Sequence, residues 1–159
     1  MSHEDLVGRA LPSYTFTVEA GKVIEFATAV LADDALHFDA EAAAAAGYAA
    51  VVAPPTFSAA AQSWGAPTEG GLELDLSRVL AGGAQWEYDL PIVAGDVLTV
   101  SGEVVSVEHK TGRRGGMTLI TRESRFVNQR GELALTVRST AIELDRTPAD
   151  RRSQDLEDA

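Results

Sequence analysis

Two adjacent carboxylates and a histidine lie close together in the first third of the chain. Asp33 and Asp34 are followed by His37. A carboxylate and an imidazole at this spacing are typical of proton transfer, because histidine titrates near neutral pH. A structural interpretation is equally open. Aspartate side chains form turns, and His37, between two apolar residues, can be a half-buried, hydrogen-bonded residue.

The segment before these residues has the periodicity of a helix. Its apolar residues recur at i, i+3, i+4, i+7 and i+8, which is one stripe on a helical surface: Val23, Phe26, Ala27, Val30 and Leu31. Negative charge is unfavourable just after the C-terminal end of a helix. The position of the two aspartates therefore indicates either a turn or a site.

Two alanine-rich segments follow. Residues 39–47 predict a short helix, with Asp39 as N-cap and Gly47 at the C-terminal stop. Residues 54–64, "PPTFSAAAQSW", predict a second helix with Thr56 as its cap. The small side chains of this second helix allow another element to wrap closely around it. We expect the N–H groups at its start to be suitable donors to an oxyanion.

The rest of the pattern is mostly β. A first strand is predicted over 14–19, and four longer ones over 83–90, 97–108, 116–127 and 132–144, with turn signals between them. This order predicts an α+β protein in which an antiparallel sheet is wrapped around one central helix, the hot-dog fold. We expect a single domain over 1–144 and a polar, flexible tail over 145–159.

Composition excludes several classes of function. The 159 residues carry a net charge of −11, which weighs against nucleic acid or an anionic membrane as partner. The absence of cysteine and the three scattered histidines give a metal site little support, and we expect no cofactor. No apolar run reaches the ~18 residues of a membrane span, and the acidic N-terminus does not resemble a signal peptide. We therefore expect a cytoplasmic protein.

One local exception to the acidic charge is a Gly-rich turn that carries Lys110, Arg113 and Arg114. It is either the solvated tip of a hairpin or a contact for the phosphates of a coenzyme A or carrier-protein arm.

Four segments resemble the MaoC-like, (R)-specific hydratase/dehydratase family of hot-dog proteins. They are "GRALPSYTFTVEAGKVIEFATAV", "ALHFDAEAAAAAGYAAVVAPPTF", "QWEYDLPIVAGDVLTVSGEVVSV" and "RESRFVNQRGELALTVRSTAIEL". The chain is most similar to single-domain subunits that resemble the N-terminal half of two-domain acyl dehydratases. It also resembles the substrate-binding subunit of heterodimeric (3R)-hydroxyacyl-ACP dehydratases.

The resemblance implies a dimer whose sheets join edge to edge, with a thioester tunnel between the protomers. In active relatives a Gly-Asp-x-Asn-Pro-Leu-His motif adds water to a 2,3-enoyl thioester or removes it, and backbone N–H groups polarise the thioester carbonyl. The resemblance also implies a set of substrate contacts in the second segment: Tyr48, Pro55, Thr56 and Phe57.

The motif is incomplete in this chain. His37 falls on its histidine, but Ala32 stands at the catalytic aspartate, Asp34 at the asparagine and Leu31 at the glycine. Either Asp33 or Asp34 acts from a shifted position together with His37, or this subunit is not the catalytic one.

The leading hypothesis is a hot-dog subunit of a 3-hydroxyacyl-thioester dehydratase or enoyl hydratase. It would act on acyl-ACP or acyl-CoA as a homodimer, or as a heterodimer with a second MaoC-like subunit that supplies the complete dyad. One alternative is a non-catalytic protein that binds an acyl chain in the same tunnel. Another is that the tunnel serves a different thioester or polyketide-type reaction.

Overall fold

One antiparallel sheet of five strands forms the body of the protein. The computed structural model describes residues 3–67, 72, 74–112 and 115–145. The strands lie in the order β1-β3-β4-β5-β2. They are β1 (Ala10–Thr17), β2 (Val79–Tyr88), β3 (Val97–Gly112), β4 (Gly115–Val127) and β5 (Leu133–Leu144). All four pairings are antiparallel, so the predicted α+β class with long antiparallel strands is confirmed.

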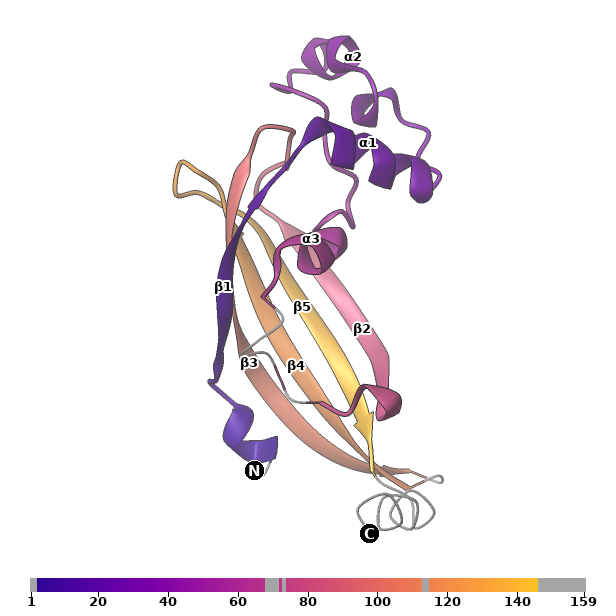
Figure 1. Ribbon diagram of the computed structural model, residues 1–159, viewed down its shortest axis with the longest axis vertical. Helices are drawn as coiled ribbons and strands as arrows, with labels where there is room; N and C mark the ends of the chain where they lie inside the picture. Colours follow the sequence, from indigo (N-terminus) through magenta and orange to yellow (C-terminus); the bar gives the residue numbers. More distant parts are fainter. Residues whose placement is uncertain (1–2, 68–71, 73, 113–114, 146–159) are drawn as a thin grey trace.

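The helix α3 (Ser58–Gly65) lies across the curved sheet (Figure 1). Two side chains of β2 hold this segment: Trp86 Nε1 donates to Ser58 Oγ at 3.0 Å, and the Tyr88 hydroxyl donates to the Pro55 carbonyl. Phe57, 1% exposed, packs its ring 6.0 Å from that of Phe16. A sheet wrapped around one central helix, as predicted, is therefore confirmed.

The start of α3 differs from the prediction. The helix begins at Ser58, and the preceding residues form a turn in which the Thr56 carbonyl accepts from Ala59 N at 2.9 Å. Thr56 lies two positions before the first helical residue, so its predicted role as the side-chain cap is wrong. The two prolines at 54–55 fix the entry of the chain, and the regular helix begins only after the turn.

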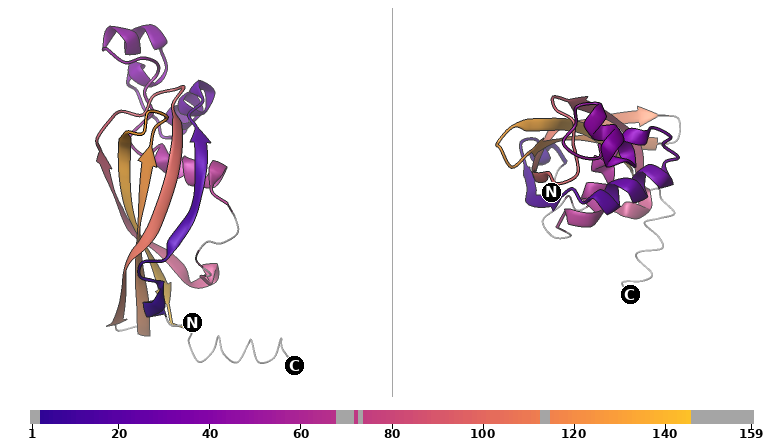
Figure 2. Two further views of the ribbon diagram at one scale, coloured as in Figure 1. Left: turned by 90° about the vertical axis from the view of Figure 1, so that its left-hand side faces the viewer. Right: turned by 90° about the horizontal axis from the view of Figure 1, so that it is seen from above.

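Two other helices lie beyond one end of the sheet and not on its face (Figures 1 and 2). They are α1 (Ala20–Ala29) and α2 (Ala40–Ala45), with a short 3-10 helix (Ala35–His37) between them. Asp39 caps α2 by accepting from Glu41 N at 2.8 Å, as predicted. Because α1 ends at Ala29, the predicted apolar stripe stops at Ala27, and the last two of its residues are exposed: Val30 by 47% and Leu31 by 88%.

The segment "PIVAGD" forms a turn before β3. The carboxylate of Asp96, 6% exposed, accepts from Val93 N at 3.0 Å and from Gln129 Nε2 at 3.2 Å. Gly95 has φ +95°, a conformation that favours glycine. The "PIVAGD" motif therefore has a structural role, because the Asp96 carboxylate closes the turn.

The far end of the sheet carries two short 3-10 helices, His3–Leu6 and Leu76–Arg78. Arg78 joins the second of them to β5 through Glu143, at 3.1 Å, and also pairs with Asp75 at 2.9 Å.

The Gly-rich basic turn around residues 110–114 lies only partly within the described residues. Lys110 pairs with Glu108 at 3.0 Å, as expected of a solvated hairpin, while Arg113 and Arg114 lie outside the described residues. The predicted tail after residue 145 lies outside them too. No helix in the described part of the chain is long and apolar enough to cross a membrane.

Candidate functional site

His37 is the last residue of the 3-10 helix Ala35–His37. Its Nδ1 lies 2.7 Å from the carbonyl oxygen of Val52. A carbonyl can only accept, so Nδ1 carries a proton. In the neutral ring Nε2 therefore holds the free lone pair and is the nitrogen available as a base. The bond ties the histidine to a segment fifteen residues away, and Val52 N in turn donates to the Leu36 carbonyl at 2.9 Å.

The two aspartates do not approach this ring. Asp34 is exposed, and its Oδ1 accepts from Leu36 N at 3.0 Å, which starts the 3-10 helix. Asp33 is also exposed. Within the described residues no ion pair joins either carboxylate to His37. The turn-forming interpretation of Asp34 therefore has direct geometric support.

The chain turns sharply between α1 and these residues. Ala32 N donates to the Ala27 carbonyl at 2.9 Å, and Leu31 N donates to the Thr28 carbonyl at 3.1 Å. This pair of bonds is a Schellman motif, which places one residue in the left-handed region. That residue is Leu31, with φ 57°. The glycine of the family motif would suit this conformation, and Leu31 occupies its place.

A cavity of about 340 Å³ lies close to this loop. It shares Val52 with the histidine contact and is lined mainly by apolar residues: Val52, Ala53, Pro55, Leu90, Pro91 and Ile92. Tyr88 and Asp89 add a phenol and a carboxylate. Burial raises the pKa of Tyr88 to about 12, so its hydroxyl stays protonated and donates to the Pro55 carbonyl.

The four predicted substrate contacts fall in different environments. Pro55 lines the cavity, while Thr56 is exposed in the adjoining turn. Phe57 is 1% exposed, so the structure gives it a core role and no surface open to a substrate. Tyr48 is half-buried just after α2 and is not part of the cavity lining. Asp89 was not predicted, since a single acidic residue at a strand end carries no distinctive signal.

The N–H groups at the start of α3 are partly occupied. Those of Phe57, Ala59 and Ala60 donate to carbonyls of residues 54, 56 and 57. The N–H groups of Thr56 and Ser58 make no backbone hydrogen bond in the described chain. These two are the donors that the predicted oxyanion contact could use.

Comparison with solved structures gives the class. A MaoC-like dehydratase superposes with a TM-score of 0.75 at 31% identity, covering 90% of this chain and 43% of that longer one. The HadBC (3R-hydroxyacyl-ACP dehydratase) complex from Mycobacterium tuberculosis superposes with a TM-score of 0.68 at 26% identity, covering 82% and 94%. The protein is thus a hot-dog protein of the MaoC-like type.

Sequence comparison gives the family. The model of the FAS1-like dehydratase domain region matches residues 5–137, and the chain belongs to this family. Among curated proteins, a UPF0336 protein of Leifsonia xyli subsp. xyli is 38% identical over 143 residues, covering 86% of this chain and 92% of that protein. A UPF0336 protein of Clavibacter michiganensis is 39% identical over 142 residues, covering 87% and 93%.

Proposed function

We propose that the chain is the substrate-binding subunit of an (R)-specific 3-hydroxyacyl-thioester dehydratase or enoyl-thioester hydratase. In this proposal a second MaoC-like hot-dog subunit supplies the complete Asp/His dyad. The observation that carries the proposal is the use of both polar groups for local structure: Asp34 caps its own turn, and His37 bonds to the Val52 carbonyl. Ala32, at the motif's aspartate, offers only a methyl group.

The reaction explains why the missing carboxylate matters. Dehydration removes a proton from the α-carbon and a hydroxide from the β-carbon, so one group must accept a proton and another must donate one. His37 has one nitrogen committed to a backbone carbonyl and, in the described chain, no carboxylate paired with it. The subunit would instead contribute the apolar cavity beside Val52 for the acyl part of the thioester.

The edge strand β2 supports a hot-dog partner. Its ten residues, "VLAGGAQWEY", contain one charge, and most of them are exposed, including Leu80 at 53%. An exposed edge strand with few charges is a template for pairing with another strand. The opposite edge, β1, contains Pro12, which lacks an N–H, and an irregular register beside it. We therefore place the partner, a second copy or a related subunit, along β2.

Hydration of crotonyl-CoA and of a longer enoyl-CoA, followed at the enoyl absorbance, tests the proposal. The chain alone should give no turnover, and addition of a MaoC-like subunit with an intact motif should give turnover that His37→Ala leaves nearly unchanged. Asp34→Asn is the matched variant, because asparagine caps a turn as well as aspartate but removes the charge. Robust turnover by the chain alone, lost in both variants, would refute the proposal and show a rebuilt dyad.

The alternative of a non-catalytic acyl-binding protein is supported by the same observation, that Ala32 stands where the motif has its catalytic aspartate. It predicts thioester binding by the chain alone and no turnover with any MaoC-like subunit. Titration of a non-hydrolysable acyl-CoA into the chain, with and without the partner, separates the two proposals.

A further inference from the structure

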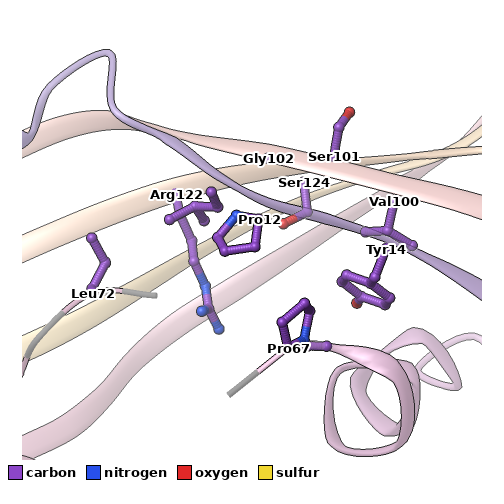
Figure 3. A pocket seen from close by; sticks show the side chains of 11 residues that line it. Pro12, Tyr14, Pro67, Leu72, Val100, Ser101, Gly102, Arg122 and Ser124 are labelled. Atoms are coloured by element: carbon purple, nitrogen blue, oxygen red, sulfur yellow. The ribbon is translucent and has the colours of Figure 1, made fainter. Parts of the chain in front are cut away.

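A second cavity, of about 220 Å³, lies under β1, away from the cavity beside Val52. Residues of β1, β3 and β4 form one side of it, and Ala66, Pro67 and Leu72 form the other (Figure 3). Apolar side chains make up much of its wall: Leu11, Pro12, Pro67, Leu72 and Val100. A water molecule takes up about 30 Å³ of liquid, so this space holds roughly seven of them and is far too large for one bound water.

The hydroxyl of Tyr14, a lining residue, is buried without a hydrogen-bond partner. It is the one buried side-chain polar atom in the described residues that has none. Native proteins pair nearly all such groups, and a buried hydroxyl without a partner is unfavourable. The neighbouring Pro12, Pro67 and Val100 side chains offer it nothing to bond (Figure 3).

Arg122 brings a positive charge to the same cavity. Its Nε donates to Ser139 Oγ at 2.8 Å, which fixes the side chain on the sheet. The charge of Arg122 lowers the pKa of Tyr14, but burial raises it by more, so the phenol keeps its proton and remains a donor. The cavity therefore combines an apolar wall, a buried O–H donor and a nearby cation, an arrangement that selects an oxygen acceptor.

We propose that this cavity binds a small organic molecule with an apolar body of about six carbons and a terminal oxygen acceptor, a carboxylate or a carbonyl, which accepts from the Tyr14 hydroxyl. The site needs neither His37 nor a partner subunit, so it goes beyond the dehydratase proposal and stands if that proposal fails.

Titration of the purified full chain with hexanoate and with 2-hexanone, followed by NMR chemical shifts of side chains lining the cavity, tests the site. Tyr14→Phe removes only the hydroxyl and should weaken binding about tenfold, as expected for one hydrogen bond to a charged or polarised group. Thr15→Val, which removes an exposed hydroxyl from the adjacent position of β1, is the matched control and should bind like the parent. Tighter binding of hexanoate identifies a carboxylate ligand; equal binding identifies a neutral carbonyl.

A stability measurement without ligand tests separately whether the Tyr14 hydroxyl lacks a hydrogen-bond partner. If the hydroxyl has no partner, Tyr14→Phe should unfold at the same urea concentration as the parent or at a higher one. A lower midpoint would show that the hydroxyl already has a structural partner, and the proposal would be wrong. Equal binding of both probes to Tyr14→Phe and to the parent, or no binding of either probe to the parent at millimolar concentration, would also overturn it.

Discussion

Replacing Leu31 with glycine should stabilise the protein. Leu31 is the left-handed residue of the Schellman motif that ends α1, with φ 57°. This conformation costs an L-residue roughly 1–2 kcal/mol, because Cβ approaches the following carbonyl oxygen. The side chain is 88% exposed, so its removal loses little burial. Leu31 therefore occupies a position at which glycine is the better residue.

The size of the gain follows from two opposing effects. Leu31→Gly removes the cost of about 1–2 kcal/mol, and the greater freedom of glycine in the unfolded chain takes back about 0.4–1 kcal/mol. With the middle of each range, the net gain in the free energy of unfolding is about 0.8 kcal/mol. For a domain of this size it corresponds to a rise in Tm of about 1–4 °C.

Urea denaturation of the parent, Leu31→Gly and Leu31→Ala measures the effect. Alanine keeps Cβ and hence the conformational cost, so Leu31→Ala should stay within about 0.5 kcal/mol of the parent. If Leu31→Ala stabilises as much as Leu31→Gly, the gain comes from removing an exposed apolar side chain, and the argument from φ is refuted. A loss of stability in Leu31→Gly would refute it as well, and would indicate that this side chain packs against something in solution.

Three further predictions concern the fold. Asp96→Ala should lower the free energy of unfolding by about 2–3 kcal/mol, because two partly buried hydrogen bonds to its carboxylate are lost. Asp96→Asn keeps one acceptor oxygen and should cost less in the same urea titration. Trp86→Phe should cost about 1–3 kcal/mol by leaving Ser58 Oγ unpaired, and Ser58→Ala added to it should cost less than the sum of the two. Hydrogen bonds from Ser77 and Arg78 lower the pKa of Asp75 to about 2. The stability that the ionised carboxylate contributes above pH 3.8 should therefore be lost as the pH falls from 3.8 to 2. In a titration of the urea midpoint against pH, Asp75→Asn should remove this loss.

Local signals predicted the fold well where the responsible residues are neighbours in sequence. The cap at Asp39 depends on N–H groups two and three positions away, and the turn at Asn128 on those of Arg130 and Glu132. The end of α1 was missed for a related reason. The apolar stripe continues to Leu31, and the glycine that commonly marks a Schellman motif is absent.

The candidate sites depend on contacts that no local pattern contains. The acceptor of His37 is the backbone of Val52, fifteen residues away, and any residue could supply that carbonyl. Tyr14 and Arg122 meet because β1 and β4 both lie beside β3. The sequence identified the polar residues around His37, but the contacts between distant segments decide which of these residues come together.

The strand order also has a consequence for how the chain folds. β3, β4 and β5 are consecutive neighbours that can form as two hairpins, whereas β1 and β2 each close a long loop: Ala10 pairs with Glu103, and Val79 with Glu143. Such long loops close late in folding, because the chain must lose conformational entropy to close them before the strand contacts can compensate. During synthesis β2 is completed before its only partner in the sheet, β5, has been made. The two edge strands, β1 with no charged residue and β2 with one, are therefore both exposed without a partner on the nascent chain, where self-association competes with folding.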